Sequence, residues 1–373
     1  MMPSLTYSPV QSWWVQLDRF TAPPAIRTLL RTASHQLRPA PAFPPFEPTI
    51  CQRQDAVLAS GQAGPHQLAT IIRDYSRGPV PTIVLGGFVP DASEAVFLLR
   101  DYLRRQGILY CVNYPRHGFN LELLFAQLDD LVEELALRYG QQPVIFAVSF
   151  GVGLLLEWLR RHRMVGGPPV LRGVVLVSPV ACVEDLLPDA SAKPTTLLGR
   201  AIKPYLEAGG AIDARLVEKS RAIFSKMFEA GAQNRAALKG LMTAGELQRL
   251  RAAVRATIQG IDFTGACERV QSLQQMLPPP AYFQLEVLPL CDAPTLILYS
   301  EKEDAVIAEA SPTRRALAAA HRAYFPQSDC RVVGNPKGAP VQHASLIFHC
   351  TNFLPMLAGF YRRVRTRREQ LAA

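Results

Sequence analysis

The chain has 373 residues, of which 49% are hydrophobic and 19% charged, and its formal net charge is +9. This size and composition indicate a globular protein with a sizeable core, built as about two domains or as one large α/β domain with an insertion. The positive charge is diffuse apart from the run at residues 362–368, so we expect no nucleic-acid binding and only a weak contact of that run with acidic membrane surfaces.

Residues 1–50 are expected to form an extension to the folded core. The apolar spacing at 13–20 predicts one amphipathic helix, and the proline-rich segment 38–48 predicts an extended arm, because proline cannot donate a helical hydrogen bond. Regular structure is predicted to begin with a hairpin whose strands are residues 56–59 and 68–75, on either side of a Gly/Pro turn region.

From residue 82 onward, strand and helix signals alternate. The predicted strands are residues 82–85, 108–112, 144–148, 173–177, 295–299 and 330–333. The predicted helices are residues 94–105, 121–139, 154–162, about 308–324 and about 345 onward. This alternation predicts an α/β fold, with a mostly parallel, twisted sheet covered by helices on both faces.

The alternation is interrupted between Asp185 and Pro294, where the sequence has helical character and is rich in alanine and arginine. A helical insertion between two parallel strands is expected to cover the C-terminal edge of the sheet, where such sheets carry their ligand sites. We therefore predict a first core part at 51–185, a helical cap at 186–289 and a second core part at 290–373. The alternative role of the insertion is a packing or oligomer surface.

Cysteine usage and the apolar runs indicate a cytoplasmic protein. The seven cysteines are scattered and never spaced as C-x-x-C, which argues for reduced thiols and against a disulfide framework or a zinc site. The first residues lack a basic segment followed by an apolar core, so no signal peptide is expected. The longest apolar run ends at Glu157 and is too short to span a bilayer.

Ser149 is the candidate nucleophile. An apolar, β-branched run reaches it, and an apolar helical pattern follows at once. A sharp strand-to-helix turn lifts a serine hydroxyl off the end of a sheet, but it crowds the backbone, so the residues two before and two after must be small. Ala147 and Gly151 meet this need in the form A-x-S-x-G. The alternative interpretation is an ordinary buried strand and helix with a serine between them.

A serine nucleophile needs a base to take its proton, and His343 is the candidate. It lies in the loop after the last predicted strand and just ahead of an apolar helix, so it can reach over the sheet edge toward Ser149. His349 is further into that helix, on a different face, and is expected to be structural. The other histidines are far from the expected edge or in the wrong place for a base: His35, His66, His117, His162 and His321.

The base in turn needs an acid that fixes its tautomer. Asp304 is the preferred candidate, because it follows the strand at 295–299 after a short polar turn and precedes an apolar segment. Glu303 and Glu301 could reach a similar place, and Asp185, after the preceding core strand, is a fourth option.

Two backbone amides are candidates for an oxyanion hole, which needs two N–H groups aimed at the developing charge. Gly86-Gly87-Phe88 directly follows the strand at 82–85, so the Phe88 amide can face the site. Phe150, which follows Ser149 at the start of a helix, supplies the second amide. The turn, the serine, the insertion, the acid and the histidine thus follow separate strands in a consistent order.

On these residues, the chain resembles the α/β-hydrolase fold superfamily in its cap-bearing form, over about 55–185 and 290–365. The family's order of serine, acid and histidine corresponds to Ser149, Asp304 and His343. The family's oxyanion turn and the loop after its next strand correspond to Gly86-Gly87-Phe88 and Pro115-Arg116-His117-Gly118. The sequence departs from the family pattern at Ala147, Val148 and Val152, where many members have glycine, histidine and glycine.

The resemblance implies a serine hydrolase that cleaves a carboxylic ester or thioester through an acyl-enzyme intermediate, with no cofactor and no metal. Apolar residues in the predicted cap favour a small-molecule substrate with an apolar acyl group. An acyltransferase and a non-catalytic binding protein of the same fold are the alternatives. A dehydrogenase is disfavoured because Leu156 stands where the third glycine of the dinucleotide motif belongs, and a metallohydrolase because no ligand cluster is present.

Overall fold

A computed structural model describes residues 45–188, 193–207, 214–231, 242–336 and 338–372, with side chains described as far as residue 366. The helix predicted at 13–20 and most of the predicted arm lie outside the described residues.

Seven strands form one sheet, and all but one of its pairings are parallel. The strands are β1 (Thr70–Pro79), β2 (Thr82–Leu85), β3 (Gly107–Asn113), β4 (Val144–Val148), β5 (Gly173–Val177), β6 (Thr295–Ser300) and β7 (Ser328–Val333). Their order across the sheet is β1-β3-β2-β4-β5-β6-β7, and only β1 runs antiparallel to its neighbour. The predicted fold class is confirmed, because this is a mostly parallel sheet with helices around it.

Helices cover both faces of the sheet, as the strands at its centre require. The helices before the insertion are α3 (Gln52–Ala59), α4 (Ala92–Ala95), α5 (Arg100–Gln106), α6 (Leu121–Tyr139) and α7 (Phe150–Val165). Those after it are α13 (Pro312–Tyr324) and α14 (Cys350–Ala372). Every residue of β4 is buried: Ile145 and Ala147 share one apolar cluster with α6, α7 and α13, whereas Val144 and Phe146 share another with α5 and α14. A strand with two buried faces reads as a continuous apolar run, which is why it is recognisable in the sequence.

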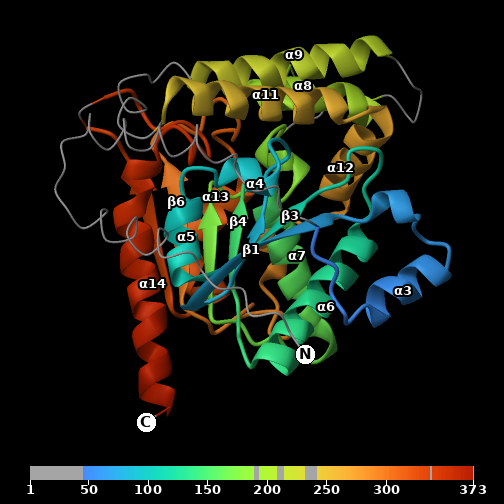
Figure 1. The fold of residues 1–373 in the computed structure, drawn as a ribbon. Helices are drawn as coiled ribbons and strands as arrows, with labels where there is room; N and C mark the ends of the chain where they lie inside the picture. The colour runs from blue at the N-terminus through green and yellow to red at the C-terminus, as the bar shows by residue number, and fades with distance from the viewer. Residues whose placement is uncertain (1–44, 189–192, 208–213, 232–241, 337, 373) are drawn as a thin grey trace.

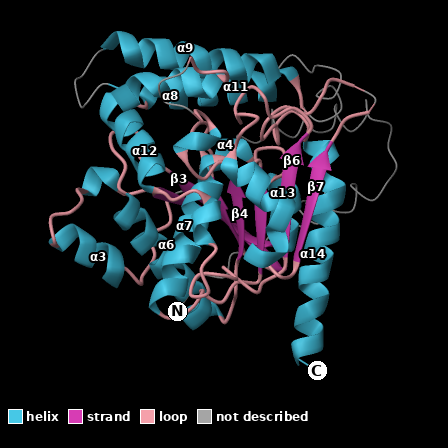
Figure 2. Cartoon of the chain, turned by 180° about the vertical axis from the view of Figure 1, so that it is seen from behind, coloured by secondary structure: helices cyan, strands magenta, loops and turns pink. Residues whose placement is uncertain are grey.

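The insertion between β5 and β6 is helical in its described residues. Its helices are α8 (Leu197–Glu207), α9 (Ala214–Gly231), α11 (Ala244–Gly260) and α12 (Phe263–Gln275). Helices α8, α9 and α11 lie across the end of the sheet toward which the arrows of β6 and β7 point (Figures 1 and 2). The insertion therefore covers the C-terminal edge of the sheet.

The predicted opening hairpin is wrong. Residues 56–59 belong to helix α3, and the strand expected at 68–75 is β1, which pairs antiparallel with β3 instead of with a preceding strand. A short apolar run does not distinguish a strand from a helix by itself. Smaller differences concern the predicted helix 94–105, which is divided into α4 and α5, and the last helix, which begins at Cys350.

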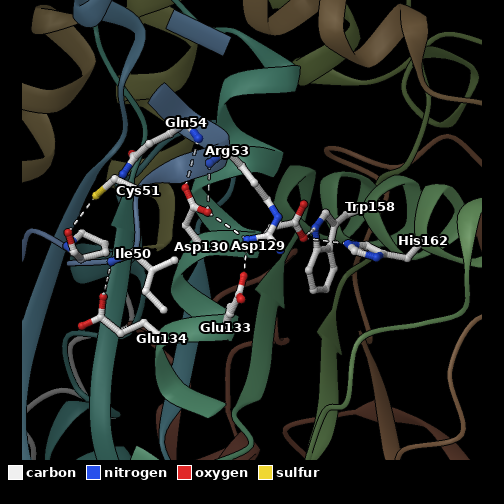
Figure 3. Close-up of polar contacts among 11 residues, drawn as sticks. Ile50, Cys51, Arg53, Gln54, Asp129, Asp130, Glu133, Glu134, Trp158 and His162 are labelled. Carbon is white, nitrogen blue, oxygen red and sulfur yellow. Dashed lines mark hydrogen bonds and ion pairs between the residues drawn. The ribbon is translucent and has the colours of Figure 1, made fainter. Parts of the chain in front are cut away.

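Carboxylates of α6 hold the N-terminal end of α3 in place (Figure 3). Asp130 accepts hydrogen bonds from the amides of Arg53 and Gln54 at 3.3 and 3.1 Å. Glu134 accepts from the Ile50 amide at 3.1 Å. The first amides of a helix have no partner within the helix and favour a negative charge nearby, so these distant acids stabilise α3. No described helix combines the length and apolar character needed to cross a membrane.

Candidate active site

Ser149 lies on a strained turn between β4 and α7. Its φ and ψ are 51° and −117°, a region that residues with a Cβ rarely occupy, and its amide donates to the Val177 carbonyl at 2.8 Å. A Cβ at Gly151 would lie 2.4 Å from the Gly86 carbonyl oxygen, so only glycine fits there. Ala147 is fully buried. The turn thus has the small residues that its crowding requires.

His343 contacts Ser149 directly. Its Nε2 lies 2.9 Å from Ser149 Oγ, within hydrogen-bond distance. The loop after β7 brings the histidine to this place, and the Ala344 amide next to it donates to Ser178 Oγ at 3.0 Å. A neutral histidine whose proton is on Nδ1 is the form that can accept the serine proton.

Glu303 holds the other side of this ring. Its Oε2 lies 2.5 Å from His343 Nδ1, and its Oε1 accepts from the Ser300 amide at 2.6 Å and from Ser178 Oγ at 2.8 Å. The Glu303 side chain has no exposed surface. With Nδ1–H donating to this carboxylate, the histidine is fixed in the tautomer whose Nε2 faces the serine.

The structure corrects the prediction of Asp304 as the acid. Asp304 is exposed, whereas the residue before it is buried and contacts His343. The chain turns after β6, so neighbouring residues point in different directions. A glutamate has one methylene more than an aspartate, and Glu303 reaches the ring from inside the turn.

The other two acid candidates have different roles. Asp185 is fully buried and accepts hydrogen bonds from the Ala181 and Cys182 amides and from Ser311 and Thr313. Glu301 accepts from the Val341 and Asn335 amides, in the loop that carries the histidine. Both carboxylates hold loops near the site, and neither contacts the ring of His343.

His349 also supports this loop, in agreement with its expected structural role. It is buried, its Nδ1 lies 2.9 Å from Ser345 Oγ, and its Nε2 lies 3.2 Å from the Ala339 carbonyl oxygen. Burial lowers the pKa of His349, so the neutral form is favoured. His117 lies elsewhere, exposed and 3.0 Å from Asp262.

Backbone strain is concentrated at this site. Among the described residues, the non-glycine residues with positive φ are Ser149 (51°), Ser178 (48°) and Ala344 (48°). Each such conformation costs about 1–2 kcal/mol and persists only where the surroundings enforce it. Ser149 is one partner of the serine–histidine contact, and Ala344 directly follows the other partner, His343. Ser178 donates to Glu303. The backbone is therefore strained at the groups that would react.

The two predicted oxyanion amides lie on two turns: that of Phe150 on the turn at Ser149, and that of Phe88 on the turn that follows β2. A Cβ at Gly87 would come 3.5 Å from the Ser149 Cβ, so the Gly86–Phe88 turn passes directly beside the serine. In the part of the chain that the structure describes, the Phe88 and Phe150 amides donate to no protein acceptor. The two phenyl rings pack edge to face with centroids 5.1 Å apart. Both amides are thus available to a ligand beside Ser149.

A cavity of about 150 Å³ opens above the serine, with Ser149 and His343 in its wall. The insertion contributes the apolar side chains Leu198, Phe224, Met227, Phe228, Val254 and Ile258. The core contributes Phe88, Val306, Ile347 and Phe348. Apart from His343, no ionisable side chain among the described residues lines this cavity.

Comparison with known proteins identifies the fold. No protein-family model and no curated protein matches the chain. Solved structures do match: an epoxide hydrolase from Bacillus megaterium (12% identity, TM-score 0.54, 79% of this chain and 97% of that chain) and MenH from S. aureus (13%, 0.52, 79% and 98%). An esterase from Exiguobacterium antarcticum matches with 14% identity and a TM-score of 0.50, over 79% of this chain and 96% of that chain. This chain has the α/β-hydrolase fold.

Within the α/β-hydrolase fold, three residues near the site went unrecognised in the sequence. Ser178 directly follows the strand at 173–177, so its place at the C-terminal sheet edge is a signal that could have found it. Glu94 and Arg269 gave no such signal. Glu94 lies in α4, shortly after the Gly86–Phe88 turn, whereas Arg269 lies in α12, and only the docking of the insertion on the core brings Arg269 near the turn.

Proposed function

We propose that this protein is a serine hydrolase that cleaves a carboxylic ester or thioester through an acyl-enzyme intermediate. One observation carries the proposal: the continuous contact from Ser149 Oγ to His343 Nε2 (2.9 Å) and from His343 Nδ1 to Glu303 (2.5 Å), on a strained turn in the wall of a cavity. Nucleophile, base and orienting acid within hydrogen-bond reach of one another are the arrangement that activates a serine.

The reaction follows from this arrangement. Ser149 Oγ attacks the carbonyl carbon while its proton moves to His343 Nε2, and the carbonyl oxygen becomes an oxyanion that accepts from the Phe88 and Phe150 amides. The oxyanion then collapses, and the leaving alcohol or thiol takes the proton from His343. Water repeats the sequence on the acyl-serine, with His343 as its base, and releases a carboxylic acid and free Ser149. Glu303 accepts from His343 Nδ1–H and stabilises the imidazolium.

A serine at this position favours acyl transfer over epoxide opening, although one similar structure is an epoxide hydrolase. Attack of Ser149 on an epoxide carbon would form an ether, which water at neutral pH does not cleave, so the protein would not turn over. Attack on an ester forms a second ester, which the same base and amides can hydrolyse. The nucleophile therefore selects among the activities of proteins with this fold.

The cavity favours an uncharged, apolar acyl group. Its wall is mostly aliphatic and aromatic, and the described residues that line it offer no fixed charge to a carboxylate, phosphate or ammonium group on the acyl chain. Burial of an apolar chain contributes about 25 cal/mol per Å², whereas burial of an unpaired charge opposes binding strongly. We therefore expect p-nitrophenyl butyrate to be hydrolysed faster than the corresponding succinate half-ester.

Labelling with a fluorophosphonate probe tests the proposal. The wild-type protein is expected to be modified at Ser149, whereas folded Ser149→Ala is not, and Asp304→Asn is the matched control that keeps the label. Folded wild-type protein that neither reacts with the probe nor hydrolyses p-nitrophenyl butyrate would refute the proposal. Addition of acceptor alcohols to the ester assay distinguishes hydrolysis from acyl transfer, because a transferase forms the new ester faster than the free acid.

A further inference from the structure

Arg269 is a buried cation whose neighbours are backbone carbonyls. It belongs to α12 of the insertion, and only 2% of its surface is exposed. Its guanidinium donates to the Phe88 carbonyl at 2.6 Å, to the Pro115 carbonyl at 2.9 Å and to the Tyr114 carbonyl at 3.4 Å. Burial lowers the pKa of Arg269 to about 10, so the side chain remains charged at neutral pH.

Stability alone is a poor explanation for this arrangement. Desolvation of a guanidinium costs several kcal/mol, and a directly bound carboxylate is the usual compensation. The hydrogen bonds of Arg269 given by the structure go to carbonyl oxygens, and its Nε is buried without a hydrogen-bond partner among the described residues. An apolar side chain of similar length would avoid the desolvation. The arrangement therefore indicates that Arg269 serves to hold these carbonyls in place.

One of these carbonyls belongs to the turn beside Ser149. The Tyr114 hydroxyl donates to the Gly86 carbonyl at 3.0 Å, and Arg269 donates to the Phe88 carbonyl. The peptide unit between these two carbonyls is the one that carries the Phe88 N–H. Since both neighbouring peptide planes are held from one side, the plane between them has little freedom to rotate, and the direction of the Phe88 N–H is set.

We propose that Arg269 is a positioning residue for the oxyanion hole, holding the Gly86–Phe88 turn so that the Phe88 amide faces the reacting carbonyl. This inference rests on the proposed function. Tyr114 acts with it: the guanidinium lies 5.7 Å from the Tyr114 ring centroid, so the two groups that hold the turn also contact each other. Because α12 belongs to the insertion, the oxyanion hole is held in place only when the insertion is docked on the core.

Rates on an ester and its thionoester test this role. A thiocarbonyl sulfur accepts hydrogen bonds poorly, so an intact oxyanion hole favours p-nitrophenyl butyrate over the thionobutyrate, and a misdirected amide reduces that preference. Arg269→Met is expected to lower kcat on the ester by about tenfold or more with little change in KM, and to reduce the ester-to-thionoester ratio of kcat/KM. Arg269→Lys, which keeps the charge and one donor direction, is expected to restore part of both.

Arg221 provides a matched control. It also lies in the insertion and donates to two backbone carbonyls, those of Gln259 and Ile261, neither of which belongs to the Gly86–Phe88 turn. Arg221→Met should leave the ester-to-thionoester ratio at the wild-type value even where the melting temperature falls. Tyr114→Phe removes only the hydroxyl that holds the Gly86 carbonyl and should reduce the ratio in the same direction as Arg269→Met.

The outcomes separate this inference from the proposed function. Wild-type protein without ester hydrolysis, or Ser149→Ala with full activity, overturns both. With the wild type active and Ser149→Ala inactive, an unchanged ratio in folded Arg269→Met overturns the positioning role alone. If Arg269→Met does not fold, Arg269→Lys and Tyr114→Phe decide: unchanged ratios in both variants overturn the inference, and lowered ratios support it.

Discussion

Two carboxylate–histidine pairs in this protein have similar contact distances and very different surroundings. Asp129 Oδ1 lies 2.7 Å from His162 Nε2, and Glu303 Oε2 lies 2.5 Å from His343 Nδ1. The Trp158 indole N–H donates to the same Asp129 oxygen at 2.8 Å (Figure 3), and the indole packs edge to face on the His162 ring. The other ring nitrogen of His343, Nε2, lies 2.9 Å from Ser149 Oγ.

The difference lies in the elements that carry each pair. Asp129 and His162 project from helices α6 and α7, where the backbone is relaxed and both side chains are partly exposed. Glu303 and His343 follow strands β6 and β7 at the C-terminal sheet edge, and the Glu303 side chain is fully buried. A histidine–acid pair is common in proteins. It becomes a candidate catalytic pair here because a strained serine and a cavity lie on its far side.

Removal of the proposed nucleophile, the Ser149 hydroxyl, is the change with the largest effect that we predict. Ser149→Ala should lower kcat on p-nitrophenyl butyrate by a factor of about 10³–10⁶, because the proposed acyl intermediate forms on the Ser149 hydroxyl. Its fold should be retained, since the serine hydroxyl is not needed by the backbone bonds of the turn. Steady-state rates and circular dichroism would check both points, and a Ser149→Ala variant with wild-type kcat would exclude this serine as the nucleophile.

Substitution of each histidine by glutamine, in separate variants, tests the difference between the two pairs directly. His343→Gln should reduce kcat by about 10³-fold or more, since the serine loses its base. His162→Gln breaks the pair with Asp129. It should leave kcat within about twofold and lower the free energy of unfolding by about 1 kcal/mol. Urea denaturation and ester hydrolysis measured on both variants provide the test. Equal losses of kcat would mean that the surroundings do not distinguish the pairs.

The two neighbouring acids offer a sharper test. Glu303→Gln should lower kcat by about 10²–10⁴-fold, because the amide no longer stabilises the imidazolium and can present its NH₂ group to Nδ1. Asp304→Asn, one residue away and exposed, should leave kcat unchanged. A large loss of kcat in Asp304→Asn, together with an active Glu303→Gln, would show that the acid is Asp304, the residue that the sequence favoured.

The sequence predicts the position of a candidate residue well where one strand end determines it. β4 and β5 match their predicted bounds because both of their faces are buried, and Ser149 and His343 follow from the strand order. The choice between Glu303 and Asp304 could not be made, because neighbouring residues in a turn face opposite ways and only the three-dimensional path decides. Helix α3 was missed for a related reason: Asp130, which holds its first turn, lies far along the chain.

Glu94 is a buried carboxyl that, among the described residues, is hydrogen-bonded to no histidine. Glu94 of α4 is 9% exposed; it accepts from Thr257 Oγ1 of α11 at 2.8 Å and from the Asp91 amide at 3.1 Å. Burial, and secondarily the negative charge of Asp91, raise the pKa of Glu94 from 4.5 to about 7, although Arg116 opposes the shift. In the part of the chain that the structure describes, no base is hydrogen-bonded to Glu94, so we expect this acid to affect stability and docking of the insertion instead of the chemical step.

Because the folded-state pKa of Glu94 is raised, the unfolded chain loses its proton at lower pH than the folded protein does. The stability that the protonated form contributes is therefore complete below about pH 4.5 and is lost as the pH rises through about 7; the shift corresponds to about 3 kcal/mol. Glu94→Gln should remove this loss, so that the variant is more stable than the wild type by about 3 kcal/mol at pH 8 and nearly equal to it at pH 4.5. Urea denaturation across this range measures the difference. Parallel pH profiles of the two proteins would mean that Glu94 is ionised in the fold, and that burial under α11 does not hold its proton.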